Sequence, residues 1–175
     1  MREIIFDTET TGYAASTGRI IEIGCVELLN GTLTGNTFQR YLNPERSIHP
    51  RALEVHGLTS EFLRDKPKFI DIASELLAFI GDSTLIAHNA SFDMGFLNAE
   101  LARVNLPAIA KERAVDTVAL SRKLNTHLAH HNLDALCRAY GIDNSNRTLH
   151  GALLDAKLTA EIYIKMKQEI KAGAF

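Results

Sequence analysis

Two acidic side chains, Asp7 and Glu9, lie two positions apart at the end of an isoleucine- and phenylalanine-rich run at residues 3–7. If this run is a strand, its alternation sends both carboxylates to one face and Thr8 to the other. Apolar residues of both parities predict a strand buried on both faces, where paired carboxylates need a counter-charge such as a divalent cation. Taken alone, however, an Asp-x-Glu tripeptide is more often a solvated pair or a loop cap.

A third carboxylate and a histidine–aspartate pair extend this set. Asp93 falls in the first turn of a helix predicted after the apolar run at 84–89, where the helix dipole alone would also explain an acid. His150 and Asp155 are five residues apart, which on an ideal helix separates them by about 140°. They can face each other only if His150 precedes the helix, and Gly151 favours a helix start there. A lone histidine near a helix start is more often structural or exposed than catalytic, so the case rests on the whole set.

The elements that must carry these residues change from strands to helices along the chain. Apolar, β-branched runs predict strands at 3–7 and 20–28, and Asn30-Gly31 predicts a hairpin into an antiparallel third strand within 36–43. The later predicted elements are a short helix after residue 52, an amphipathic helix at 69–80, a strand at 84–89, a helix capped by Asn89 or Ser91, a short strand or helix start at 114–120, a helix ending at Gly141 and a long helix within 149–170. This order predicts an α/β fold, in which a mixed sheet with a three-stranded antiparallel start and then parallel strands is flanked by helices.

Length and composition narrow the class of protein. The chain has 175 residues, 46% of them apolar, which suits a single domain over residues 1–175. Nineteen basic and 21 acidic residues give a formal net charge of −2, which argues mildly against a non-specific nucleic-acid-binding module. Cys25 and Cys137 lie in apolar runs without metal-ligand spacing, so we expect reduced core thiols and a cytoplasmic protein. Without a signal-peptide pattern or an apolar run of about 18 residues, we expect neither secretion nor membrane insertion.

Taken in order, the motifs Asp-Thr-Glu at 7–9, Asn-Ala-Ser-Phe-Asp at 89–93 and His-x4-Asp at 150–155 resemble the histidine-type DEDD exonucleases. The segments FDTETTG, IIEIGCVEL, VHGLTSEFL, IAHNASFDMGF, NLDALCRAYGIDNS and RTLHGALLDA extend the resemblance to the DNA-proofreading branch of this family over nearly the whole chain. The resemblance implies a ribonuclease H-like fold. It also implies a 3′→5′ exonuclease that releases nucleoside 5′-monophosphates from DNA and proofreads for a replicative polymerase.

Roles for single residues follow from the same resemblance. The implied ligands of two Mg²⁺ or Mn²⁺ ions, which prefer oxygen donors, are Asp7, Glu9, Asp93 and Asp155. His150 is implied to accept the proton of the attacking water. The implied substrate contacts are Asp7, Thr8, Glu9, Thr10, His56, Asn89 and Asp155. Turn chemistry would explain the threonines equally well, and helix capping alone would explain Asn89.

The implied partners are single-stranded or frayed 3′ DNA ends, a polymerase catalytic (alpha) subunit and a small accessory (theta-like) subunit. Arg51 departs from the proofreading pattern, which has an acidic residue there near the substrate, so a cation at this position could instead meet phosphate. The chain also ends soon after the last predicted helix, where proofreading relatives continue into a polymerase-binding tail. The length of the sequence fits either a trimmed domain or a relative without this tail.

The stretch THLAHHN is rich in histidine. Its histidines, which are His127, His130 and His131, lack the spacing of a metal site, and we expect a solvated loop there.

A free-standing RNA-trimming exonuclease of the same superfamily is one alternative function, because the metal chemistry does not distinguish DNA from RNA. A non-catalytic partner-binding platform is the other, although the intact carboxylates and His150 argue against it. Since an editing enzyme must accept any base, we expect little sequence preference.

Overall fold

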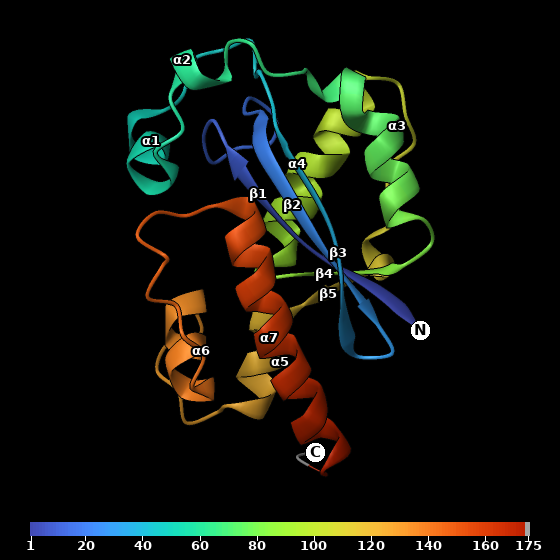
Figure 1. Cartoon of the computed structure of the whole chain (residues 1–175), viewed down its shortest axis with the longest axis vertical. Coiled ribbons are helices and arrows are strands. Elements are labelled where there is room, and N and C mark those ends of the chain that lie inside the picture. Colours follow the sequence, from blue (N-terminus) through green and yellow to red (C-terminus); the bar gives the residue numbers. More distant parts are fainter. Residues whose placement is uncertain (174–175) are drawn as a thin grey trace.

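A computed structural model of the chain describes residues 1–173, in which a five-stranded mixed sheet carries helices on both faces (Figure 1). The elements in chain order are β1 (Arg2–Thr10), β2 (Ile20–Leu29), β3 (Thr32–Tyr41), α1 (Pro50–His56), α2 (Ser60–Leu63), α3 (Phe69–Ile80), β4 (Thr84–Ala87), α4 (Ala90–Arg103), the 3-10 helix η1 (Lys111–Arg113), β5 (Ala114–Asp116), α5 (Thr117–Leu124), α6 (Leu133–Tyr140) and α7 (Ala152–Lys171). The α/β class predicted from the sequence is confirmed.

The strand β1 lies at the centre of the sheet, whose order is β3-β2-β1-β4-β5. The pairs β1–β2 and β2–β3 are antiparallel, whereas β1–β4 and β4–β5 are parallel. The predicted antiparallel start followed by parallel strands is therefore confirmed. Because the middle of β1 is paired with neighbouring strands and covered on both faces, Ile4, Ile5 and Phe6 before the acidic end are apolar and buried.

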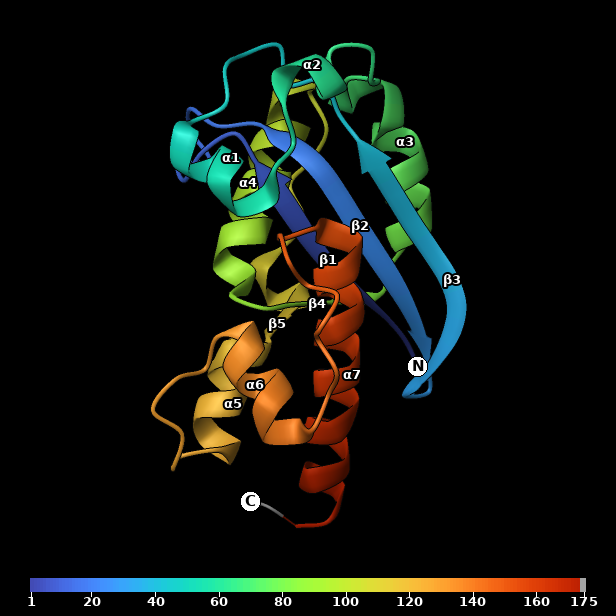
Figure 2. The same cartoon turned by 60° about the vertical axis from the view of Figure 1, so that its left-hand side comes forward.

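Alternate residues of β1 face two different cores. Ile4 and Phe6 pack in the core formed with α3 and α4, whereas Ile5 packs in the core formed with α7. Figures 1 and 2 show α7 crossing one face of the sheet while α3 and α4 cover the other. Strand alternation places Asp7 and Glu9 on the same side as Ile5, which is the side of α7.

Two segments differ from the predicted elements, and a third forms both of two alternative predicted elements. The strand β3 begins at Thr32, directly after the Asn30-Gly31 turn, rather than near residue 36. Its first six residues are exposed, so no apolar alternation marked them in the sequence. The region after residue 52 forms two short helices instead of one, because Gly57 takes a left-handed backbone (φ 69°) that ends α1. The segment 114–120, where a strand and a helix start were both open, contains both in succession.

The two cysteines are buried free thiols, as predicted. Burial raises the pKa of Cys137 to about 11, so this side chain stays a protonated, unreactive thiol at neutral pH. Within residues 1–173, none of the helices combines the length and the apolarity that crossing a membrane requires.

Gly24 in β2 allows the start of α7 to lie directly on the sheet. A Cβ atom at this position would lie 2.4 Å from the backbone nitrogen and 2.5 Å from the Cα of Leu153. Both are backbone atoms, which cannot move aside by changing a rotamer. Gly24 is also the partner of Asp7 in the β1–β2 register, so this close contact sets how near α7 lies to the acidic end of β1.

We predict that Gly24→Ala lowers the free energy of unfolding by about 1–3 kcal/mol or more, because the added methyl overpacks a backbone contact. Thermal unfolding measured in EDTA would show a lower Tm than wild type. Gly95→Ala in α4 is the matched control, since its nearest neighbour would be the Ala15 Cβ at 3.9 Å. Alanine favours helix, so this control should keep or raise the Tm. An unchanged Tm for Gly24→Ala would contradict the close contact.

Candidate active site

Acidic side chains from β1 and α4 meet at the carboxyl end of β1. Asp7 and Glu9 share one face of the strand, as predicted, and this face is the α7 side. Asp93, in the first turn of α4, is buried and accepts two hydrogen bonds from Thr8 on its Oδ1, one from the backbone N–H at 2.9 Å and one from the hydroxyl at 2.7 Å. Thr8 points away from its acidic neighbours, as predicted. Its two hydrogen bonds orient the Asp93 carboxylate.

The loop and first turn of α7 bring a histidine and a fourth carboxylate to the same place. Gly151 is the N-cap of α7, so His150 lies in the preceding loop, as predicted, and Asp155 in the first turn. Ligand atoms of Glu9, His150 and Asp155 all lie within 4.8 Å of one another. His150 Nδ1 is 3.8 Å from Asp155 Oδ2, and the side chains are 46% and 5% exposed. A buried acid thus faces a histidine that solvent can reach.

Two hollows meet at these residues. The side chains that line both are Asp7, His88, His150 and Asp155. The first hollow, of about 190 Å³, continues along β1 and α1 and includes the aromatic side chains of Tyr13 and Phe92. The second, of about 450 Å³, continues over the start of α6 and includes Asn89, Asn132 and Arg147. An extended ligand can therefore pass from one hollow to the other across the acidic cluster.

The acidic cluster is electrostatically unfavourable without a cation. Burial, followed by the charges of Asp155 and Glu22, raises the pKa of Glu9 to about 8. Burial also raises the pKa of Asp93 to about 7, although its hydrogen bonds from β1 act in the opposite direction. Asp7 likewise has a pKa well above the ordinary range, because of burial and then the charge of Asp93. A bound cation would reverse these shifts. Carboxylate oxygens beside one imidazole are a donor set that fits a hard divalent cation.

Two residues of the cluster were missed by the sequence analysis, Glu22 and Arg147. Glu22 lies opposite Glu9 in the β1–β2 register and accepts the backbone N–H of Ala152 at 3.0 Å, which caps the start of α7. Arg147 forms an ion pair with Asp155. The available signal for Glu22 was a glutamate between isoleucines in a largely apolar strand, since a buried acid needs a partner. Nothing in the local pattern distinguished Arg147 from a solvated loop residue.

The remaining predicted contacts lie around the hollows. His56 is buried, with its Nε2 3.2 Å from the Thr10 carbonyl oxygen, and both residues line the first hollow. Asn89 lines the second hollow, but the predicted capping of α4 by its side chain is wrong. Its backbone is left-handed (φ 70°), so the side chain makes no capping hydrogen bond, and Asp116 accepts its N–H at 3.0 Å. Arg51 is exposed on α1 and is not among the residues that line either hollow.

The histidine-rich stretch is a loop, as predicted, but its members differ. His127 and His130 are exposed. His131 is half-buried, and its Nδ1 lies 2.8 Å from the Ser121 hydroxyl oxygen. Among the residues that the structure describes, the group with metal-ligand distances is the one at the end of β1 and does not include these histidines.

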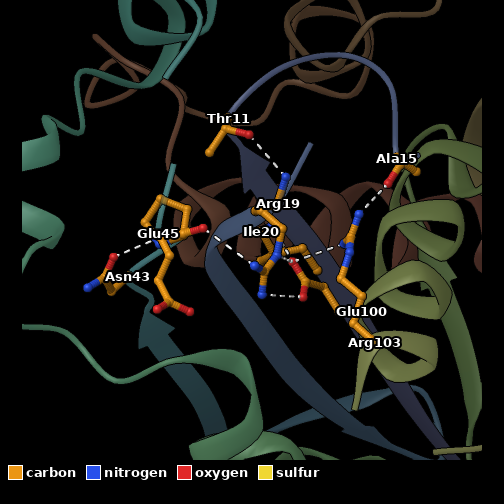
Figure 3. Close-up of polar contacts among 9 residues, drawn as sticks. Thr11, Ala15, Arg19, Ile20, Asn43, Glu45, Glu100 and Arg103 are labelled. Atoms are coloured by element: carbon orange, nitrogen blue, oxygen red, sulfur yellow. Dashed lines mark hydrogen bonds and ion pairs between the residues drawn. The ribbon is translucent and has the colours of Figure 1, made fainter. Parts of the chain in front are cut away.

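A partly buried ion pair anchors the loop after β1, residues 11–19 (Figure 3). Arg19 donates to both carboxylate oxygens of Glu100 on α4, from Nε at 2.8 Å and from Nη2 at 3.0 Å. Glu100 is fully buried and also accepts the backbone N–H of Ile20 at 3.0 Å. The Thr11 hydroxyl accepts the backbone N–H of Arg19 at 3.0 Å, which closes the loop. The rim of the first hollow is thereby tied to the helix that carries the third carboxylate.

We predict that Glu9→Gln raises the Tm of the metal-free protein more at pH 8 than at pH 5. The folded pKa of Glu9 is about 8, above the ordinary value of 4.5. The stability contributed by its protonation is therefore complete below about pH 4.5 and is lost as the pH rises towards 8. A glutamine keeps the neutral form at every pH. Thermal unfolding in EDTA at both pH values measures the difference.

The control for this prediction is the exposed Glu112, changed in the same way. Glu112→Gln should shift the Tm by the same small amount at pH 5 and pH 8. If Glu9→Gln also gave equal shifts at the two pH values, the raised pKa of Glu9 would be contradicted.

Comparison with known proteins gives matches over most of the chain. The family model described as "Exonuclease" (RNase_T) matches residues 4–163. DNA polymerase III subunit epsilon of Rickettsia typhi is 49% identical over 170 residues, which cover 95% of this chain and 74% of that protein. The subunit epsilon of Escherichia coli (strain K12) is 47% identical over 173 residues, which cover 94% of this chain and 71% of that protein.

Solved structures with the same fold include several exonucleases. Exonuclease X, solved in complex with 5′ overhanging duplex DNA, is 28% identical with a TM-score of 0.72, and the match covers 99% of this chain and 93% of that one. The nuclease domain of 3′hExo, described as a DEDDh family member bound to rAMP, has a TM-score of 0.80 at 20% identity, covering 96% of this chain and 92% of that one. The latter likeness concerns the fold alone.

Proposed function

Because this chain belongs to the exonuclease family, we propose that it is a 3′→5′ exonuclease that releases nucleoside 5′-monophosphates from DNA. Within the family, it is related to DNA polymerase III subunit epsilon. The observation that carries the proposal is the meeting of Glu9, His150 and Asp155 within 4.8 Å of one another, where two hollows join. Asp7 lies in both hollows and Asp93 in the first.

Two divalent ions, Mg²⁺ or Mn²⁺, would be held by the carboxylates of three elements, which are Asp7, Glu9, Asp93 and Asp155. Ions bound there would supply an acidified water and neutralise the negative charge that develops on the leaving oxygen. The protein's own contribution is to fix the ligands. Thr8 holds Asp93 by two hydrogen bonds, and the cap on α7 places Asp155 in its first turn.

His150 would accept the proton of the attacking water. Burial and the charge of Arg147 lower its pKa, so the imidazole is neutral and able to take a proton at cellular pH. Its position in a loop leaves it 46% exposed, within reach of a water that enters from either hollow. The neighbouring Asp155 would stabilise the imidazolium that forms.

The first hollow would receive the terminal nucleotide. Tyr13 and Phe92 offer aromatic faces, and Thr10 and His56 lie on its polar side. Stacking on such faces is tolerant of base identity, which suits an enzyme that must remove any nucleotide. The second hollow, which Asn89 and Asn132 line, would hold the strand that leads to the scissile phosphate.

A proofreading role for a replicative polymerase is the finer part of the proposal. Identities of 47–49% to epsilon subunits, over 94–95% of this chain, support DNA over RNA as the substrate. The partners would then be a polymerase catalytic (alpha) subunit and a small accessory (theta-like) subunit. An RNA-trimming exonuclease is the second candidate, since 3′hExo shares the fold.

We predict that the protein shortens 5′-labelled single-stranded DNA stepwise from its 3′ end in Mg²⁺ or Mn²⁺. EDTA should abolish the reaction, and so should Asp7→Ala, because the ligand set is then incomplete. His150→Ala should lower kcat about 10²- to 10⁴-fold, the usual contribution of a general base. Gel electrophoresis of timed reactions measures all three.

Exposed His130 provides the matched control, and His130→Ala should digest DNA at the wild-type rate. A matched RNA oligonucleotide is run in parallel. Faster cleavage of RNA than of DNA would move the chain to the second candidate function. Absence of metal-dependent cleavage of both the DNA and the RNA oligonucleotide would refute the enzymatic proposal and favour a partner-binding role.

A further inference from the structure

The guanidinium of Arg147 holds Asp155 at two points. Its Nε donates to Asp155 Oδ1 and its Nη2 donates to Oδ2, both at 2.7 Å. The side chains are 7% and 5% exposed, so water competes little with either bond. A planar two-point contact of this kind fixes both the direction and the rotation of a carboxylate. Asp155 is therefore held in a single orientation.

A second acid holds Arg147 in turn. Its Nη1 donates to Asp134 Oδ1 at 3.0 Å, and Asn144 Nδ2 donates to the same oxygen at 2.8 Å. These bonds join α6, the loop before α7 and the first turn of α7. Every nitrogen of the guanidinium thus contacts a protein carboxylate. Because the side chain is also nearly buried, little of Arg147 is left to bind a substrate phosphate directly.

The two-point contact is compatible with a cation on Asp155. An ionised carboxylate offers about four lone-pair sites, and Arg147 occupies two of them. Of the described residues that line the two hollows, Arg147 is the only lysine or arginine, and it faces several carboxylates. One positive charge therefore reduces the repulsion among these groups without cancelling the attraction for a divalent ion.

The same contact restrains the loop that carries His150. Arg147 lies three residues before His150, whose backbone N–H donates to the Val55 carbonyl oxygen at 3.0 Å. In Figure 1 the segment between α6 and α7 runs towards α1 before α7 begins. The loop is thus fixed at one point to α1 and at another to α7.

We propose that Arg147 is a positioning residue, which presets Asp155 as a metal ligand and holds the His150 loop beside it. The inference rests on the proposed function, because it takes Asp155 to be a ligand of a divalent ion. Hydrogen-bonding partners of metal ligands typically contribute about 10- to 100-fold to metal affinity. The two-point geometry carries the effect, so a lysine, which is a single-point donor, does not replace the arginine.

The test is a calorimetric titration of the substrate-free protein with Mn²⁺, well below the Tm of each variant. Arg147→Gln and Arg147→Lys should each weaken Mn²⁺ binding by about 10-fold or more. Asp134→Asn, which loosens the arginine but keeps it, should cause a smaller loss. Arg138→Gln and Arg138→Lys, on the exposed side of α6, are the matched controls and should bind as wild type. On single-stranded DNA, kcat should fall in the Arg147 variants while KM for DNA changes little.

Several outcomes would overturn the inference. Wild-type Mn²⁺ affinity in both Arg147 variants, even with a lowered Tm, would leave the arginine a purely structural role. Affinity lost in Arg147→Gln and kept in Arg147→Lys would assign the effect to charge instead of geometry. Tighter binding in Arg147→Gln would show competition with the metal. These results leave the proposed metal site intact, whereas a wild-type protein that binds no Mn²⁺ would refute that site and the inference with it.

Discussion

Repulsion between carboxylates at the end of the central strand is the constraint on which the rest of the structure depends. Asp7 and Glu9 lie beyond the part of β1 that pairs with β4, and their pairing with β2, opposite Gly24 and Glu22, keeps the two carboxylates close together. Asp93 and Asp155 approach them from helices on opposite faces of the sheet. Burial and like charge together raise the carboxyl pKa values there. The fold thus holds an arrangement that is unfavourable alone and becomes favourable when a cation is present.

The surrounding polar contacts supply the rigidity that this arrangement requires. Glu22 caps α7 from the neighbouring strand, while Gly24 removes the side chain that would hold the helix away. On the other face, the ion pair of Arg19 with the buried Glu100 ties the loop after β1 to α4. Each contact joins two elements distant in sequence, and each orients a segment that carries one of the acids. The site is therefore supported from every element that contributes to it.

The sequence predicted what strand and helix periodicity control. The α/β class, the antiparallel start of the sheet and the position of His150 before α7 follow from apolar spacing and from Gly151. The exposed first half of β3 could not be predicted, because an unburied strand carries no apolar alternation. The αL backbone of Asn89 and the contacts of Glu22 and Arg147 depend on which elements become neighbours. Such tertiary pairings are not encoded in local spacing.

The order of the four acids along the chain has a consequence for synthesis. Asp7 lies on β1 and is synthesised well before Asp155, which lies on α7. Helix α7 also packs against Ile5, Val26 and Leu28 of β1 and β2, so these apolar side chains remain open to solvent until it docks. A nascent chain that stops before α7 lacks the core on the α7 side of the sheet and lacks the Asp155 carboxylate. Under the proposed function, assembly of the complete set of metal ligands is thereby coupled to the docking of α7.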